Sequence, residues 1–284
     1  MIERMQLNDI CWSVGRGRVV DPAPFLIVGI LNVTPDSFYD GGEYNTIDKA
    51  LNRAEEILSQ GGHIIDVGGE STRPFSPRVE LEEELTRVIP VVNKILAKYP
   101  QALLSVDTYK ARVAKEALEA GAVIVNDVSA CRFDPSLIDV LVQYKPGYVL
   151  MHSLGRPETM QHDPKYTDVV DEIKSFFEKY LGKLVKAGLP EENIVLDPGI
   201  GFGKLLEHNL DILRRIQEFF YLDRPIYIGL SNKSLWEKLL GLRPEERFVA
   251  TQVGTALMAH KGVKIHRVHE VKLTADTLKI VSSI

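Results

Sequence analysis

Polar side chains able to bind a ring system or an anion stand at the ends of short apolar runs from residue 25 onward. Carboxylates and amides pair with ring N–H groups and carbonyls, while arginine, lysine and histidine bind anions. Any one of these residues could simply cap a loop. Their recurrence at the same place in each unit indicates one site with acceptors and an anion-binding side. They are Asn32, Asp66, Asp107, Asn126, Asp127, His152, Asp197, Ser231, Lys233, Arg267 and His269.

The apolar runs alternate with longer amphipathic stretches, which predicts eight strand–helix units. Near-continuous apolar strands between helices are typical of a parallel sheet buried on both faces, and eight units favour a closed barrel. In such barrels the active site lies at the carboxyl ends of the strands, where these polar residues fall. The predicted strands are 25–31, 63–67, 103–106, 123–126, 148–151, 194–196, 226–229 and 265–268, and the predicted helices are 47–60, 81–98, 110–120, 134–144, 167–187, 207–219, 234–261 (broken near Gly241–Pro244) and 270–282.

The predicted fold is therefore α/β, a single (β/α)8 TIM barrel with an N-terminal β-hairpin. A barrel of this kind needs roughly 250 residues, which fits a chain of 284. Residues 1–24 are assigned to the hairpin, with strands Ile10–Val14 and Arg18–Val20, and residues 25–284 to the barrel. We expect the hairpin to plug the N-terminal mouth of the barrel.

Three loops carry further signals. Residues 32–42 follow the first strand with a proline, glycines and short polar side chains, so this segment can act as a closing lid. Residues 68–74 follow the second strand and include Arg73, whose guanidinium suits an anion. Residues 197–204 are rich in glycine but match neither dinucleotide nor Walker spacing. Lys204 at the end of this stretch is expected to be solvated.

The bulk composition excludes several classes of protein. The chain is 45% hydrophobic and 26% charged, and its formal net charge of −5 gives no basic patch for nucleic acid. Cys11 and Cys131 lie far apart and in no metal-type spacing, which suits a reducing cytosol. No segment approaches the roughly 20 apolar residues of a membrane span, and no apolar signal-peptide core is present at the N-terminus. We expect a cytoplasmic protein that binds small molecules.

Several motifs resemble those of the dihydropteroate synthases, a family of pterin-binding enzymes. ILNVTPDSFYDGG (30–42) and IIDVGGESTRP (64–74) resemble the family's two signature segments. The likeness continues in order through SVDTYK (105–110), VNDV (125–128), LMH (150–152), DPGIGFGK (197–204), SNKS (231–234) and RVHEV (267–271). The resemblance implies an enzyme of folate biosynthesis that joins 6-hydroxymethyl-7,8-dihydropterin diphosphate to p-aminobenzoate, giving 7,8-dihydropteroate and pyrophosphate.

The resemblance also implies which side chains hold the pterin. Its amino and ring N–H groups need carboxylate and amide partners, its carbonyl or ring nitrogen needs a donor, and a cation can stack on its face. For the apolar members of such a site, plain core packing is an equal alternative. The matching polar residues are Asp107, Asn126, Asp197, Lys233 and Arg267, and the matching apolar floor is Val128, Met151, Phe202 and Gly229.

By the same resemblance, the diphosphate lies beside Asn32, Arg73, Arg267 and His269. Mg2+, a hard cation, would bridge phosphate oxygens and the side-chain oxygen of Asn32, and it would keep several waters. Only this one protein ligand is expected, so the metal would come largely with the substrate.

The p-aminobenzoate is expected over Thr72, Pro74 and Phe202, beside Arg73. Its carboxylate would lie near Ser231 and the following turn. Closure of the first loop would bring Phe38 against this substrate and exclude water.

No covalent enzyme intermediate is needed for the implied reaction. The electron-rich dihydropterin expels pyrophosphate, and nearby cations stabilise the charge on the departing group. Asp107 would offset positive charge on the pterin. The residues implied as catalytic are Asp107, Lys233, Arg267 and Asp36, the last of which would move in with the closing loop.

Two positions depart from the family pattern, and both bear on the aminobenzoate. Asn232 stands where the motif after the seventh strand normally has arginine, which removes a planar cation. Phe75 stands where a glycine usually follows STRP, which can stiffen or reshape the loop. Neither change touches the residues assigned to the pterin.

Three other functions stay open from the residues. A pterin-dependent methyltransferase of the methyltetrahydrofolate–corrinoid type shares the barrel but has no diphosphate for the loops 32–40 and 72–73 to serve. A catalytically inactive pterin-binding paralogue would lose Asn32, Arg73 or His269, all of which are present. A barrel lyase working through a Schiff base would have to use Lys233.

The family resemblance suggests a homodimer and a target of sulfonamides. The long helical region 245–282 offers apolar surface for an interface. The same surface could equally belong to the jacket of the barrel itself.

Overall fold

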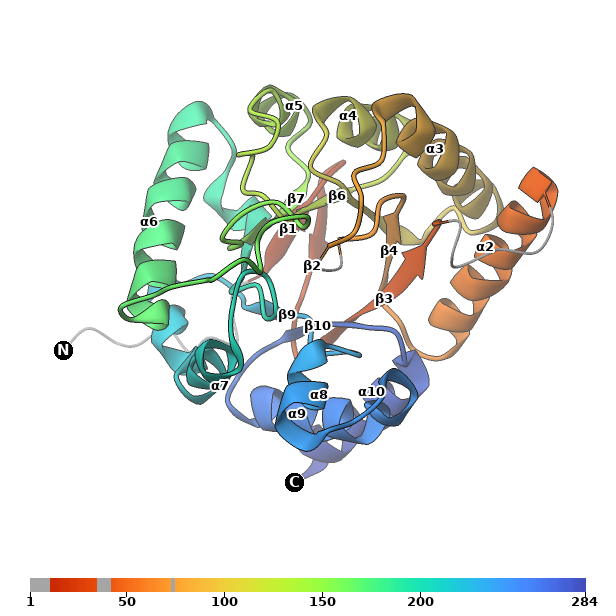
Figure 1. Cartoon of the computed structure of the whole chain (residues 1–284). Helices are drawn as coiled ribbons and strands as arrows, with labels where there is room; N and C mark the ends of the chain where they lie inside the picture. The colour runs from red at the N-terminus through yellow and green to blue at the C-terminus, as the bar shows by residue number, and fades with distance from the viewer. Residues whose placement is uncertain (1–10, 35–41, 73–74) are drawn as a thin grey trace.

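Eight parallel strands close into one barrel with helices around it (Figure 1). The computed structural model describes residues 11–34, 42–72 and 75–284. The strand order is β8-β7-β6-β5-β4-β3-β10-β9, and a parallel bridge between Leu196 and Ile226 joins its two ends. The predicted (β/α)8 barrel is confirmed. Its strands are β3 (Leu26–Asn32), β4 (Ile64–Gly68), β5 (Leu103–Asp107), β6 (Ile124–Asp127), β7 (Gly147–Met151), β8 (Ile194–Asp197), β9 (Tyr227–Ile228) and β10 (Ile265–Val268).

The helices follow the strands along the chain and cover the outside of the barrel (Figure 1). Each buries one face; in α3, for example, Leu85, Val88, Val92 and Ile95 are buried at the three- and four-residue spacing of a helix. No helix in the described part of the chain combines the length and hydropathy needed to cross a membrane. The helices are α2 (Gly42–Ser59), α3 (Leu81–Lys98), α4 (Ala111–Ala120), α5 (Leu137–Tyr144), α6 (Val169–Ala187), α7 (Leu206–Arg214), α8 (Ser234–Leu240), α9 (Phe248–His260) and α10 (Val271–Ser283).

Apart from shifts of up to three residues at their ends, four predicted elements differ from the observed ones. The helix predicted over 47–60 begins five residues earlier, as α2 at Gly42. The seventh strand, predicted over 226–229, is only Tyr227–Ile228. The predicted helix 207–219 ends as α7 at Arg214, and a 3-10 helix, Ile216–Leu222, follows it. Ile216 and Phe219 are the buried residues of this 3-10 helix, and their three-residue spacing places both on one side of it. The predicted helix 234–261 is divided into α8 and α9, because Gly241 is left-handed with φ 72° and Pro244 follows.

The alternation of side chains along the strands brings the polar residues into the mouth of the barrel. Ile64 and Ile265 belong to the apolar cluster that fills the barrel interior. Side chains two residues apart on a strand point to the same face, so Asp66 and Arg267 also point inward, one layer nearer the carboxyl ends. The same spacing relates Ile124 to Asn126 and Val195 to Asp197.

The N-terminal hairpin closes the opposite mouth. Strands β1 (Trp12–Val14) and β2 (Arg18–Val20) pair antiparallel, and Trp12, Val14 and Val20 join the interior apolar cluster. The indole Nε1 of Trp12 donates to the backbone oxygen of Asn193, which precedes β8, over 2.8 Å. Within the described residues, the hairpin fills one end of the barrel interior, so we look for a ligand cavity at the other end, where the strands have their carboxyl ends.

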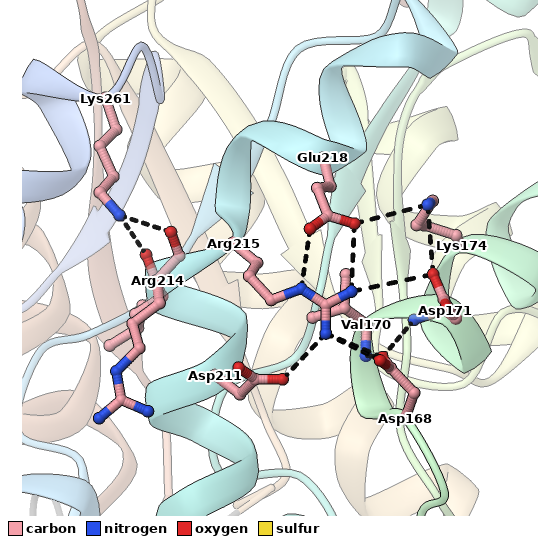
Figure 2. A network of polar contacts seen from close by, with 10 residues as sticks. Asp168, Val170, Asp171, Lys174, Asp211, Arg214, Arg215, Glu218 and Lys261 are labelled. Atoms are coloured by element: carbon pink, nitrogen blue, oxygen red, sulfur yellow. Dashed lines mark hydrogen bonds and ion pairs between the residues drawn. The ribbon is translucent and has the colours of Figure 1, made fainter.

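A polar network on the outer face joins the start of α6 to the end of α7 (Figure 2). The carboxylate of Asp168 caps α6 by accepting from the backbone N–H groups of Val170 and Asp171, each over 2.9 Å. Arg215 reaches the same carboxylate over 2.9 Å and also pairs with Asp211 and Glu218. Since Asp168 ends the long segment after β7, this network fixes where that segment rejoins the helical layer.

Replacement of Trp12 by alanine tests the role of the hairpin. The indole is 1% exposed, so its removal leaves a cavity and an unpaired carbonyl, and we expect a loss of about 3–5 kcal/mol in the free energy of unfolding. Urea denaturation followed by circular dichroism measures this. Val19→Ala in the same hairpin is the control, because Val19 is 61% exposed and should change stability by less than about 0.5 kcal/mol. Equal stability of the two variants would contradict the plug.

Candidate functional site

A cavity of about 500 Å³ opens at the carboxyl ends of the strands. The ends of β3, β5 and β10 and the segments that follow β3, β4, β7, β8, β9 and β10 form its wall, so distant parts of the chain meet there. The predicted site residues in this wall are Asn32, Thr72, Asp107, Phe202, Ser231, Lys233, Arg267 and His269. The wall also contains residues for which no role was predicted: Ile30, Thr34, Glu70, Ser71, Met160, Gly201, Ser234, Pro244 and Arg247.

The guanidinium of Arg267 joins three strands at the floor of the cavity. Its Nε lies 2.7 Å from Oδ2 of Asp66, and its terminal nitrogen lies 2.6 Å from Oδ2 of Asp107. Asn126 donates from Nδ2 to the same oxygen of Asp66 over 3.0 Å. Asp66, Asp107 and Asn126 are all buried, so these contacts form a rigid set of charge-assisted hydrogen bonds. We call Asp66, Asp107, Asn126 and Arg267 the carboxylate array.

Two oxygens of this array accept no hydrogen bond from the described residues. They are Oδ1 of Asp66 and Oδ1 of Asp107, and both are buried. Burial raises the pKa of Asp107 to about 7, against the opposing charge of Arg267, and the neighbouring Asp66 raises it further. A buried acceptor without a partner is costly, which marks Asp107 as a place for a ligand N–H group.

Asp197 and Lys233 form a second polar pair beside the array. Burial raises the pKa of the Asp197 carboxyl to about 6, although the N–H of Gly199, 2.7 Å from Oδ1, and the charge of Lys233 oppose that rise. Burial lowers the pKa of Lys233 to about 8, against the attraction of Asp197. The Nζ of Lys233 also lies 4.2 Å from the centre of the Phe202 ring, a cation–π contact.

Three of the four residues of the predicted apolar floor lie in one cluster, and the fourth lies beside Arg267. Val128 and Met151 are buried in one small cluster with Tyr109, and Phe133 and Phe202 pack against it. Gly229 lies beside Arg267, since a Cβ built on this glycine would be 3.9 Å from the backbone oxygen of Arg267. Of the four predicted floor residues, only Phe202 lines the cavity.

The outer rim holds hydroxyl, amide and imidazole groups. Oγ of Ser231 lies 2.9 Å from Nδ1 of His269 and accepts from the backbone N–H of His269 over 3.2 Å. Asn32 and Thr72 line the same cavity from the segments after β3 and β4. The predicted site residues Asp36, Phe38, Arg73 and Pro74 lie outside the described residues.

Three expectations from the sequence are wrong at the level of single side chains. Asp127 does not face the cavity; its carboxylate caps the following turn, accepting from the N–H groups of Ser129 and Cys131. His152 is buried against the ring of Phe176, 4.8 Å between ring centres, rather than converging on the rim. Lys204 is not solvated, because its side chain is buried and its Nζ is hydrogen-bonded on several sides.

The sequence reasoning placed Asp66 at a strand end but assigned it no ligand role, although it anchors the whole array. The two-residue period of a strand could have indicated this role, because it places Asp66 on the same face as Ile64. Met160 and Arg247 were missed altogether. Met160 lies in the segment after β7, and Arg247 precedes α9, where its guanidinium donates to the backbone oxygen of Asn232 over 3.3 Å. No sequence period links either residue to a strand end.

The two departures from the family pattern share one backbone property. Asn232 has φ 58° and Phe75 has φ 65°, both in the left-handed region. Asparagine tolerates this region better than most residues, so Asn232 suits its turn. Phe75 occupies a conformation that glycine adopts without strain, which explains the usual glycine there. Its ring lies 5.8 Å from that of His162, and its N–H donates to the oxygen of Pro157 over 3.0 Å, so the β4 segment contacts the β7 segment.

Comparison with known proteins shows the family to which the chain belongs. Residues 28–269 match the family described as pterin binding enzyme. The chain is 41% identical over 257 residues to the dihydropteroate synthase of Escherichia coli strain K12, covering 90% of both proteins. Its fold is similar to the Yersinia pestis dihydropteroate synthase with a sulfonamide drug complex (TM-score 0.89, 40% identity, 95% and 97% coverage) and to the Xanthomonas albilineans enzyme with 4-aminobenzoic acid (TM-score 0.89, 36% identity, 96% and 98% coverage). The chain belongs to the dihydropteroate synthase family of pterin-binding enzymes.

Proposed function

We propose that this protein is a dihydropteroate synthase, a transferase of folate biosynthesis that condenses 6-hydroxymethyl-7,8-dihydropterin diphosphate with p-aminobenzoate. The observation that carries the proposal is the buried carboxylate array with an unpaired Asp107 oxygen at a cavity next to Asp197 and Lys233. Relatives with about 40% identity over most of the chain bear this enzyme name, which supports the same activity here.

The pterin would lie on the apolar floor with its nitrogen-rich edge toward the polar groups. Asp107, Asn126 and Asp197 would pair with its amino and ring N–H groups, and Lys233 would donate to its carbonyl or ring nitrogen. Arg267 is held by two carboxylates, so its guanidinium plane is fixed before a ring stacks on it. Val128, Met151, Phe202 and Gly229 would give the ring its apolar surroundings.

The diphosphate would lie nearer the rim, beside Asn32, Arg73, Arg267 and His269. We propose that Mg2+ enters with this group and is held by the side-chain oxygen of Asn32, which lines the cavity. No group of three or more Asp, Glu, His or Cys residues that could hold a metal occurs in the described part of the chain, which fits an ion carried mainly by phosphate oxygens. When bound, the ion would offset negative charge on the leaving pyrophosphate.

The p-aminobenzoate would occupy the outer part of the cavity. Thr72, Phe202 and Ser231 line that part, and Phe38, Arg73 and Pro74 would complete it. The Xanthomonas albilineans relative is described with 4-aminobenzoic acid and the Yersinia pestis relative with a sulfonamide drug, which supports the same subsite and sulfonamide binding here.

The reaction requires a C–O bond to break at the exocyclic methylene and a C–N bond to form there. Pyrophosphate leaves with the electron pair of the C–O bond, and positive charge spreads into the dihydropterin ring, where Asp107 opposes it. The amine of p-aminobenzoate attacks the methylene carbon and then loses a proton to water. Asp36 and Phe38 would close over the site and limit the access of water to the methylene.

We further propose a cytoplasmic homodimer built on α9 and α10. Val249, Val253 and Leu257 recur every four residues on α9 and are 55–59% exposed, so they form one apolar stripe. Ile280 on the neighbouring α10 is 62% exposed. A contiguous apolar face of this kind is typical of a contact with another protein.

The dimer proposal predicts that Val253→Glu yields a monomer, because a carboxylate in an apolar interface has no partner. Light scattering coupled to size-exclusion chromatography measures the mass. Val19→Glu is the matched control, since Val19 is 61% exposed in the hairpin and lies outside the proposed interface. A wild-type protein of monomer mass at concentrations of about 100 μM would rule out the homodimer.

The activity itself is tested with purified protein, both substrates and Mg2+, by measuring pyrophosphate and dihydropteroate together. We expect Lys233→Ala to weaken pterin binding about ten- to a hundredfold, because a charged donor is lost from a buried site. Thr72→Ala should instead raise the KM for p-aminobenzoate by about three- to tenfold and leave pterin affinity unchanged. Calorimetric titration with the pterin separates the two effects. Unchanged pterin affinity in Lys233→Ala would overturn the site assignment.

Acidification should weaken pterin binding in two steps. The carboxylates of Asp107 and Asp197 must be ionised to accept from the ring, and burial raises their pKa values to about 7 and about 6. Protons therefore compete with the ligand, and affinity is lost as the pH falls through these values. At the other end, affinity should decline as the pH rises above about 8, where Lys233 loses its charge. Titration with 6-hydroxymethyl-7,8-dihydropterin, which lacks a titrating diphosphate, measures this. Asp197→Asn should remove the lower step; a pH-independent affinity in the wild type would contradict both assignments.

A further inference from the structure

The glycine-rich segment 199–203, which we call the glycine loop, is held largely by hydrogen bonds from side chains outside it. Its glycines have φ values of 68°, 84° and 67°, so the backbone takes a path that other residues rarely follow. Gln161 donates to the oxygen of Gly201 over 2.5 Å and Tyr166 donates to that of Gly203 over 2.9 Å. Oδ1 of Asn209 accepts from the N–H of Gly201 over 2.8 Å, and further contacts come from Asp197 and Lys204.

The ammonium group of Lys204 is the centre of these contacts. Its Nζ donates to the backbone oxygens of Gly199 over 2.9 Å and Phe202 over 3.1 Å. It also lies 2.9 Å from Nδ1 and 3.4 Å from the backbone oxygen of His152, at the end of β7. The side chain is 1% exposed, and burial lowers its pKa to about 7. Burying an ammonium group costs free energy of folding even when the group is hydrogen-bonded, so an apolar residue of similar size would stabilise the fold more at this position.

Two functional side chains depend on where this loop lies. Phe202 is a member of the loop, lines the cavity and carries the contact with Lys233. Asp197 accepts from the N–H of Gly199 over 2.7 Å. Lys204 itself does not line the cavity. Its hydrogen bonds therefore act on the site through Gly199 and Phe202, and its charge also opposes the rise in the pKa of Asp197.

The loop has little freedom to find another position. A Cβ on Gly199 would lie 1.9 Å from the backbone oxygen of His152, and one on Gly203 would lie 2.4 Å from Cβ of Leu154. The loop is thus pressed against the segment after β7, whose far end is fixed at Asp168 by Arg215 (Figure 2). Without the ammonium group, the oxygen of Phe202 would lose the donor that Lys204 supplies, and that of Gly199 would keep only the N–H of Phe202, 3.1 Å away.

We propose that Lys204 is a positioning residue that ties the glycine loop to the end of β7 and so presents Phe202 and Asp197 to the pterin. The proposal rests on the pterin function given above and extends it to a residue that does not touch either substrate. Lys204 should therefore affect the affinity for the pterin more than the affinity for p-aminobenzoate, because Asp197 contacts only the pterin in the proposed site.

The test compares Lys204→Met, which keeps the length of the side chain but has no donor, with Lys186→Met on the exposed end of α6 as control. We expect Lys204→Met to bind 6-hydroxymethyl-7,8-dihydropterin at least about tenfold more weakly and to raise the pterin KM more than the aminobenzoate KM. Hydrogen exchange measured by mass spectrometry should be faster in the peptide that contains residues 199–203, and unchanged in the control.

Tyr166→Phe provides a milder variant should Lys204→Met fail to fold. It removes one donor from the same loop, and we expect the same faster exchange with a smaller loss of pterin affinity. If Lys204→Met raised both KM values equally and did not speed exchange in the loop, Lys204 would contribute only to the stability of the fold, and the proposal would be overturned. Wild-type protein that makes no dihydropteroate would overturn the proposed function instead, while the exchange data would still report on the loop.

Discussion

The ion pairs of Arg267 with Asp66 and Asp107 are the constraint around which the mouth of the barrel is organised. Arg267 belongs to β10, and its partners belong to β4 and β5, with β3 between them in the sheet. Such buried pairs contribute little to net stability, because removing the charges from water offsets their attraction. Removing one partner is nevertheless costly, since the others become unpaired buried charges. The array therefore fixes the geometry of the site more than it stabilises the fold.

The free energy that stabilises the fold, and so offsets the cost of burying this array, comes from the other end of the barrel. There the interior is apolar, and Trp12 and Val14 of the hairpin complete its packing. Apolar burial of this kind contributes roughly 25 cal/mol per Å², and it needs no hydrogen-bond partners. The carboxyl end can then keep unpaired buried oxygens on Asp66 and Asp107, which a ligand can satisfy. One barrel thus divides along its axis into a stabilising end and a binding end.

Much of the fold and part of the site could be predicted from the sequence because both depend on local patterns. Apolar runs of strand length give the barrel, and the residue after each run gives Asp107, Asn126 and Asp197. What failed depends on direction and on loops. Asp127 directly follows Asn126, and the two-residue period of a strand turns it away from the interior. Lys204 is two residues from a ring that lines the cavity, yet the left-handed glycines reverse its path into the core, and no sequence period encodes that.

The charges of the cavity are unevenly distributed, and this bears on the chemistry more than the net charge of −5 does. Three carboxylates, Asp66, Asp107 and Asp197, stand against the two cations Arg267 and Lys233 around its inner part, although of these three carboxylates only Asp107 lines the cavity. An excess of carboxylate favours a ligand that is neutral or gains positive charge, and burial makes that preference stronger. A diphosphate is therefore better placed toward Asn32 and His269 at the rim than beside Asp197. The ring that gains positive charge would then lie beside the carboxylates, and the anion that leaves it would lie beside the groups of the rim, so both charges are stabilised as the C–O bond between them breaks.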